Sequence, residues 1–98
     1  MQFVQVIEYH TSRFDEMESL GRQWEAAAQS FTKARRRVLV RDRDDANHYF
    51  NIVFFDSFDE AMENSDNAVT HDFAAKLMAL VDGAPTFHNL DVIETVEY

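Results

Sequence analysis

The stretch from Asn47 to Phe55 carries apolar side chains on both of the faces that an extended strand would have. Successive side chains of a strand point to opposite faces, so residues two apart share a face. One face therefore carries Phe50, Ile52 and Phe54, and the other carries Tyr49, Val53 and Phe55. A strand with two apolar faces needs cover on both, which restricts the chain to folds that bury a sheet from two sides.

Strand and helix signals alternate along the rest of the chain and predict a single domain over residues 1–98. Runs rich in β-branched and aromatic residues predict strands at 2–9, 34–42, 47–55 and 86–97. Apolar residues at spacings of three and four predict a helix from 14 to about 29, a short helix at 57–64 and a longer helix after Asn67. The resulting order, β-α-β-β-α-β, is the ferredoxin-like α+β arrangement, in which four antiparallel strands carry the helices on one face.

Capping residues mark the predicted ends of the helices. Ser12 and Ser57 each stand three residues before an acidic residue, a pattern typical of a capping box at the start of a helix. Gly83 suits the left-handed position that follows the end of a helix, and Pro85 just beyond it prevents continuation.

The first predicted strand repeats the two-faced pattern, with Val4 and Val6 on one face and Phe3, Ile7 and Tyr9 on the other. One layer of helices can cover only one face of a sheet, and a large bare apolar face is unusual for a soluble monomer. We therefore expect a homodimer in which two sheets pack face to face as a dimeric α+β barrel. The alternative is that this face binds a different protein.

The charge and composition of the chain exclude several classes of protein. Eighteen acidic and nine basic residues give a net charge of −9, which opposes binding to nucleic acid, and strand alternation splits the only basic cluster, at 35–37, over two faces. The absence of cysteine excludes disulfides and thiolate metal sites. The longest apolar run, 77–81, is far shorter than a membrane span, and no signal segment follows Met1, so we expect a soluble cytoplasmic protein with no membrane partner.

His48, His88 and Glu8 are the predicted catalytic residues, because imidazole is the side chain that most readily carries protons near neutral pH. The proposed topology places the two histidines on the strands that flank Glu8. If the strand face that carries these residues is turned toward the helices, a His-Glu-His group lies between the helices and the sheet. There it could position a substrate proton or bind a metal. We predict the proton-transfer role, with no metal and no cofactor. The alternative is that all three are ordinary solvated side chains at strand ends.

A pocket between the helices and the sheet is the expected ligand site. Its predicted lining residues are Trp24, Phe50, Phe54, His71, Phe73 and Leu77. Core packing is the favoured explanation for the place of Trp24 on the apolar stripe of the helix, and as a lining residue its indole could stack on a flat aromatic ligand. Tyr49 and Asn51 lie on the opposite strand face, which we expect to form the core of the dimer.

Two segments, at 57–65 (SFDEAMENS) and 85–92 (PTFHNLDV), carry a resemblance to a known family. Together with the element order, they resemble the dimeric α+β barrel proteins of the antibiotic biosynthesis monooxygenase (ABM) type, over essentially the whole chain. The resemblance implies a ligand pocket between helices and sheet in each subunit. Members of this family include cofactor-independent oxygenases of polycyclic aromatic substrates and haem-degrading oxygenases.

The haem-degrading branch of this family uses an Asn on the first strand, a Trp in the middle helical segment and a His beyond it. The first strand here has no Asn, and Met62 and Lys76 stand near the other two places, so we do not expect haem degradation.

The predicted function is therefore that of a small homodimeric barrel that binds an apolar or aromatic metabolite without demonstrable catalysis. The alternative is a cofactor-independent monooxygenase, in which an aromatic, polyketide-like substrate supplies the electrons once a histidine base has removed a proton. A third alternative is a structural partner inside a larger assembly.

Overall fold

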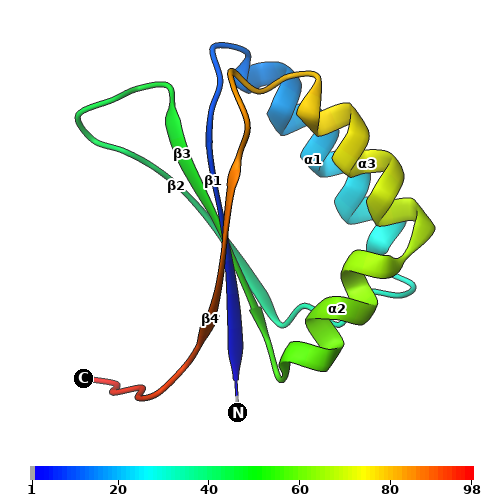
Figure 1. The fold of residues 1–98 in the computed structure, drawn as a ribbon, viewed down its shortest axis with the longest axis vertical. Coiled ribbons are helices and arrows are strands. Elements are labelled where there is room, and N and C mark those ends of the chain that lie inside the picture. Colours follow the sequence, from blue (N-terminus) through cyan, green and yellow to red (C-terminus); the bar gives the residue numbers. More distant parts are fainter. Residues whose placement is uncertain (1) are drawn as a thin grey trace.

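A computed structural model of the protein describes residues 2–98 and has the predicted order of elements (Figure 1). The strands are β1 (Phe3–His10), β2 (Arg36–Arg41), β3 (His48–Phe55) and β4 (Thr86–Asp91). The helices are α1 (Phe14–Ala28), α2 (Phe58–Asp66) and α3 (Ala68–Met78). All paired strands are antiparallel and lie in the order β2-β3-β1-β4, which confirms the ferredoxin-like α+β prediction. No helix within residues 2–98 has the length and apolar character needed to cross a membrane.

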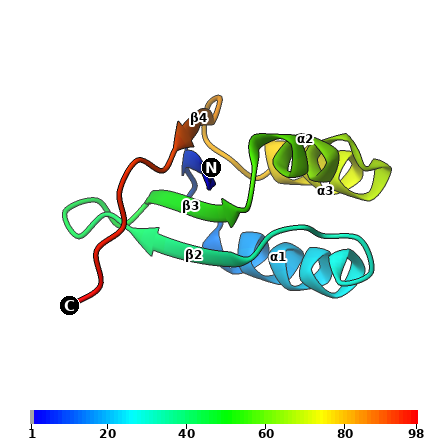
Figure 2. The ribbon, with the colours of Figure 1, turned by 90° about the horizontal axis from the view of Figure 1, so that it is seen from below.

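The three helices form one layer on one side of the sheet, and the other side is bare (Figure 1). In the perpendicular view, α1 lies on the β2 side of this layer, and α2 and α3 lie on the β4 side (Figure 2). The β2–β3 hairpin and the C-terminal tail both curve away from the helices (Figure 1). They therefore flank the uncovered side of the sheet.

Two hydrophobic clusters identify the strand face that meets the helices. In the first cluster, Phe3, Val53 and Phe55 pack around Ala61 of α2. In the second, Tyr9 and Tyr49 pack around Met17 of α1, with further side chains from α1 and from the end of α3. We call this face the helix-side face, and we call the face that carries the alternate residues the open face.

The prediction that Tyr49 and Asn51 form a dimer core is wrong, because both belong to the helix-side face. Tyr49 is only 4% exposed and stacks between the rings of Tyr9 and Phe14. Both faces of β3 are apolar, so the alternation of residues alone does not distinguish them. The aromatic partner on α1 is what selects the Tyr49 face for the core.

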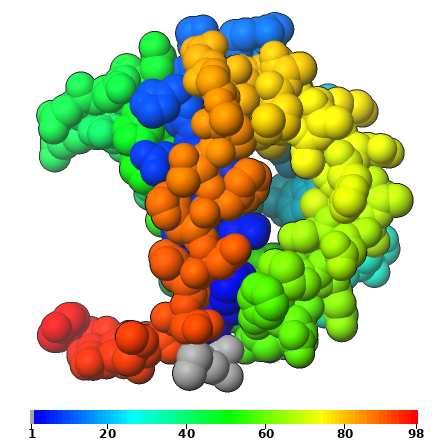
Figure 3. All heavy atoms as spheres, in the orientation of Figure 1, coloured from blue at the N-terminus to red at the C-terminus, as the bar shows by residue number. Residues whose placement is uncertain are grey.

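In the part of the chain that the structure describes, the backbone of the helix layer comes close to the strands only at α2, whereas α1 and α3 reach the sheet through side chains. α1 and α3 pack on each other, whereas of the helices in residues 2–98 only α2 has Cα atoms within 8 Å of the strands. The molecular surface is hollowed between β4 and the helices α2 and α3, and α1 is visible behind the hollow (Figure 3). The fold thus leaves space between the helices and the helix-side face.

The predicted cap of α2 is confirmed, because the hydroxyl of Ser57 accepts the N–H of Glu60. Gly83 has the expected left-handed conformation, with a φ of 84°, but it does not cap α3, which ends at Met78 with Ala79 as its C-cap. Ser12 does not cap α1 as expected. α1 begins after Arg13, and the backbone N–H of Arg13 donates to the hydroxyl of Thr11.

The predicted last strand is too long, since β4 ends at Asp91 rather than continuing to residue 97. Asp91 is the register partner of Phe3, the first residue of β1. One more backbone bond, from the N–H of Val92 to the carbonyl of Gln2, follows. Beyond Val92 the tail leaves the sheet, and Ile93 is 95% exposed.

The hydroxyl of Thr11 links the end of β1 to the start of α1 and to the segment that follows α3, and its removal should lower the stability of the fold. The residue is fully buried, donates to the carbonyl of Leu80 at 2.7 Å and accepts the N–H of Arg13. Thr11→Val keeps the shape and leaves both backbone groups unpaired, so we expect it to lower the free energy of unfolding by about 1–3 kcal/mol in urea titrations. Thr11→Ser keeps the hydroxyl and should cost less. Equal losses in the two variants would show that the methyl group matters and the hydrogen bonds do not.

Candidate functional site

The structure brings the three predicted catalytic residues together at one end of the open face. Glu8 of β1 reaches His48 on β3 with 2.7 Å between Oε2 and Nε2, and it reaches His88 on β4 with 3.2 Å between Oε1 and Nε2. The order of the strands explains this, since β1 lies between β3 and β4. One carboxylate therefore bridges two imidazoles from the neighbouring strands.

His48 is the most enclosed member of this group, with 16% of its side chain exposed. Its second ring nitrogen, Nδ1, lies 3.1 Å from Oδ2 of Asp42, at the end of β2. The Glu8 carboxylate, together with that of Asp42, raises the pKa of His48, and partial burial opposes this rise. Hydrogen bonds from His48 and then His88 hold the pKa of Glu8 below its ordinary value. The pairing thus favours an imidazolium between two carboxylates.

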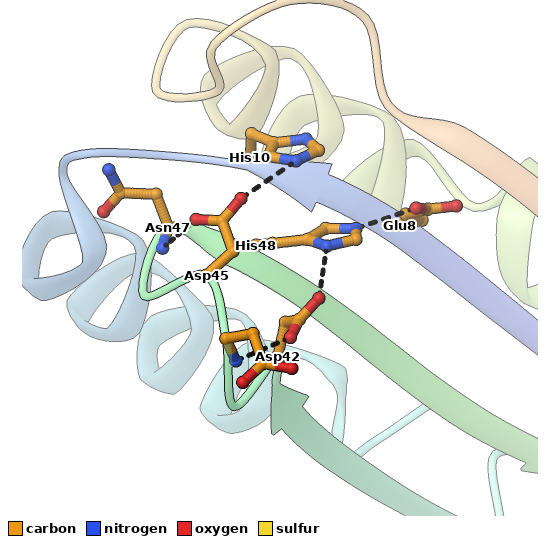
Figure 4. A network of polar contacts seen from close by, with 7 residues as sticks. Glu8, His10, Asp42, Asp45, Asn47 and His48 are labelled. Atoms are coloured by element: carbon orange, nitrogen blue, oxygen red, sulfur yellow. Dashed lines mark hydrogen bonds and ion pairs between the residues drawn. The ribbon is translucent and has the colours of Figure 1, made fainter.

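Two further titratable residues adjoin this group and were not predicted. His10 is the register partner of His48, and their rings stack with centroids 4.2 Å apart. Asp45, in the turn between β2 and β3, points its Oδ2 toward Nε2 of His10 at 3.8 Å (Figure 4). The spacing of His10 and His48 in the sequence does not reveal the contact, which follows from the register of β1 on β3.

The histidine group does not face the expected pocket. His48 and Glu8 belong to the open face, because their neighbours Tyr49 and Tyr9 pack against α1. Phe50 follows the same alternation, as does Phe54, whose ring lies under the Arg36 guanidinium with 5.4 Å between Cζ and the ring centroid. The assignment of Phe50 and Phe54 to the lining of a helix–sheet pocket is therefore wrong. The two histidines do not enter such a pocket either, because their strand face is turned away from the helices.

A cavity of about 450 Å³ does lie between the helices and the sheet, on the β2 side. Its lining residues include Trp24, Glu25, Thr32, Ala34, Arg37 and Val53. Arg37, on the helix-side face of β2, donates from Nε to Glu25 at 2.8 Å and from Nη1 to Oδ1 of Asn51 at 3.2 Å. The cavity thus combines an indole and aliphatic surface with a guanidinium that two neighbours hold in place.

The remaining predicted lining residues lie elsewhere on the helix layer. Leu77 packs on the cluster around Tyr9 and Tyr49, so it is part of the core. Phe73 is half-buried under the ammonium of Lys76, with 5.1 Å between Nζ and the ring centroid. His71 is exposed on α3. Of the six predicted lining residues, Trp24 is therefore the one that borders the cavity on the β2 side.

Sequence reasoning missed Arg37 and Asn51 as members of this site. The basic cluster at 35–37 was correctly expected to split over two faces, since Arg36 lies over Phe54 of the open face and Arg37 donates to Asn51 of the helix-side face. The register of β2 on β3 could have indicated the contact. Arg37 is the partner of Val53, and Asn51 lies two residues from Val53 on the same face of β3. Using that signal requires knowing which face meets the helices.

The Glu8–His48 pair generates a prediction about pH. His48 should titrate above the ordinary imidazole pKa of about 6.5, and Glu8→Gln should lower its pKa, both measured by NMR of the ring protons. A raised folded-state pKa contributes stability that is fully present below pH 6.5 and is lost as the pH rises through the folded value. The difference in unfolding free energy between the native chain and Glu8→Gln should therefore shrink with rising pH. Glu97→Gln, in the exposed tail, is the control; an unchanged His48 pKa in Glu8→Gln would contradict the pairing.

Comparison with known proteins identifies the fold. Neither a protein-family model nor a curated protein matches the sequence. Among solved structures, the cofactor-independent oxygenase SnoaB from Streptomyces nogalater superposes with a TM-score of 0.84 at 20% identity, covering 99% of this chain and 98% of SnoaB. A candidate antibiotic biosynthesis monooxygenase from Caulobacter crescentus superposes with a TM-score of 0.82 at 17% identity, covering 95% of this chain and 91% of the other.

A second candidate of the same description, from Nitrosomonas europaea, superposes with a TM-score of 0.78 at 7% identity and covers 94% of this chain and 90% of the other. All three similarities span nearly the whole of both chains, so they concern the complete domain. Identities this low establish the architecture and leave the activity open. The chain therefore has the ABM-like fold that its sequence resemblance implied.

Proposed function

We propose that this protein is a homodimeric, cofactor-independent oxygenase that binds a flat, enolisable aromatic compound between α1 and the sheet. The observation that carries the proposal is that Trp24 and Arg37 border one cavity. An indole face suits an aromatic ring, and a guanidinium suits an oxygen atom that becomes negatively charged. The fold that this chain shares with SnoaB, described as a cofactor-independent oxygenase, supports the same choice of chemistry.

Arg37 is the residue to which we assign recognition of the substrate oxygen. Its Nε and Nη1 groups are engaged by Glu25 and Asn51, which fix the plane of the guanidinium. Nη2 makes no side-chain hydrogen bond within residues 2–98, so its N–H groups can reach an enolate or phenolate oxygen. Donors held in place before the reaction stabilise developing charge at little reorganisation cost.

Glu25 is our candidate for the base that removes the substrate proton. Its carboxylate borders the cavity and is oriented by Arg37. The carbanion formed then reduces O₂ and forms a C–O bond, and loss of water from the peroxide leaves a carbonyl. Overall, a CH₂ group and O₂ yield C=O and H₂O, so the substrate supplies the electrons and no cofactor is required. The histidines of the open face have no part in this proposal, since they lie on the other side of the sheet.

We assign the open face to contact with a second copy of the chain. Apolar side chains cover its central strands, and Val40 and Leu90 near its two edges are 39% and 48% exposed. The hairpin and the tail flank this face, so a second sheet would fit between them (Figure 1). Two such sheets bury each other's apolar faces, the arrangement that a twofold dimer provides.

The test of the function uses the fluorescence of Trp24, the only tryptophan, together with oxygen consumption. The purified protein is titrated with 1,8-dihydroxyanthrone, a flat enolisable probe, and with its anthraquinone product. We expect saturable quenching by both compounds and catalysed uptake of one O₂ per anthrone oxidised. Quenching without turnover would identify a binding protein with the same cavity. Neither quenching nor turnover would overturn the proposal.

Arg37→Gln tests the proposed role of the guanidinium. The variant keeps a hydrogen-bonding side chain and removes the charge, so we expect kcat to fall about 100-fold, the usual effect of deleting one donor to a developing oxyanion. The control is Arg22→Gln on the exposed surface of α1, where the guanidinium pairs with Glu18 alone among residues 2–98. Anthrone oxidation followed by anthraquinone absorbance is the assay. Equal rates in the two variants would remove Arg37 from the mechanism.

Ile52→Asp tests the dimer interface. The residue lies on the open face at the centre of the sheet, where an unpaired carboxylate cannot be buried without a large desolvation penalty. Light scattering coupled to size-exclusion chromatography should give a dimer for the native chain and a monomer for this variant. Leu39→Asp, which places the same charge on the helix-side face of β2, should remain dimeric. A monomeric native chain would disprove the interface.

A further inference from the structure

The turn between β2 and β3 carries a group of side chains that the cavity does not use. His10 at the end of β1, Asp45 in the turn and His48 at the start of β3 each offer a ligand atom, and these atoms lie within 4.8 Å of one another. Strand pairing brings the two histidines together, since they are register partners. Figure 4 shows the group beside the β2–β3 turn, where the end of β1 meets the start of β3. His10 and His48 belong to the open face, whereas Arg37 belongs to the helix-side face.

Asp45 is held in one orientation by its own turn. Its Oδ1 accepts the backbone N–H of Asn47 at 3.0 Å, and its carbonyl accepts the N–H of His48 at 3.1 Å. This leaves Oδ2 directed at Nε2 of His10, 3.8 Å away. That distance is too long for a hydrogen bond. Two ligands on a tetrahedral Zn²⁺, each about 2.0–2.1 Å from the ion, lie about 3.3 Å apart. Because the His10 ring stacks on the His48 ring with 5° between their planes, the exposed His10 ring must turn out of the stack before both imidazoles can face one ion.

His48 is oriented in the way that metal-binding histidines usually are. Nε2 lies 2.7 Å from Glu8, and Nδ1 lies 3.1 Å from Asp42. Binding through Nδ1 would replace the longer contact and leave Nε2–H donating to the Glu8 carboxylate, which fixes the ring and its tautomer. The Asp42 carboxylate would then lie beside the ion as a further oxygen donor.

We propose that His10, His48 and Asp45 form a binding site for a divalent cation of the zinc class. Two imidazole nitrogens with carboxylate oxygens suit Zn²⁺, Ni²⁺ or Cu²⁺, whereas Mg²⁺ and Ca²⁺ prefer oxygen ligands alone. In the single chain the His10 and Asp45 side chains are 48% and 49% exposed, so solvent reaches both of these ligands. The bound cation links the tip of the β2–β3 hairpin to the end of β1.

Isothermal titration calorimetry of the full chain, first stripped with a chelator, tests this site with ZnCl₂ and MgCl₂. We expect one Zn²⁺ per chain and no saturable heat with Mg²⁺. His10→Ala and Asp45→Asn should each weaken Zn²⁺ binding at least tenfold, while His71→Ala, which removes an exposed histidine on α3, should bind as the native chain does. Arg37→Gln should also bind Zn²⁺ normally, which separates this site from the proposed oxygenase cavity.

A second readout locates the ion. In NMR spectra of the ring protons, Zn²⁺ should shift the signals of His10 and His48 and leave those of His71 unchanged. The proposal is overturned if the native chain gives no saturable Zn²⁺ heat, if His10→Ala and Asp45→Asn bind as tightly as the native chain, or if the shifted signals belong to other histidines.

Discussion

The two-faced character of the central strands is the constraint on which the rest of this structure depends. β1 and β3 pair with each other along their whole lengths, from Phe3 with Phe55 to His10 with His48. Each strand places apolar side chains on both faces, and three helices are enough to cover only one. The second face must therefore be buried by something outside the subunit, and the homodimer proposed above meets that need with a copy of the same surface.

Strand alternation also separates the two candidate sites. One set of alternate residues on β2 and β3 turns toward the helices; of these, Arg37 borders the cavity and Asn51 accepts a hydrogen bond from it. Residues of the other parity, Glu8 and His48, form the polar group at the end of the open face. Because α1 and α3 pack on each other instead of lying close on the strands, the helix-side cavity persists in a chain of only 98 residues.

Several features of the candidate sites followed from local pattern. The strand order that sets Glu8 between His48 and His88 follows from the βαββαβ topology, and the contacts agree with it. The choice of face did not follow from local pattern, so Phe50 and Phe54 were assigned to the wrong side of the sheet. Both faces of the central strands are apolar, so residue propensities and the periodicity of the sequence do not distinguish them. The decision lies in long-range packing against α1 and α2, which no local rule encodes.

The sequence by itself determined the order of the elements, the start of α2 and the left-handed conformation of Gly83, because these depend on hydrogen bonds and backbone preferences between near neighbours. It also required a sheet that is apolar on both sides. Only the tertiary structure decided which side the helices cover, where β4 stops and which polar groups meet. Those outcomes depend on the register of strands far apart in the chain. β4 ends at Asp91, the register partner of the first residue of β1, and His10 meets His48 because β1 pairs with β3.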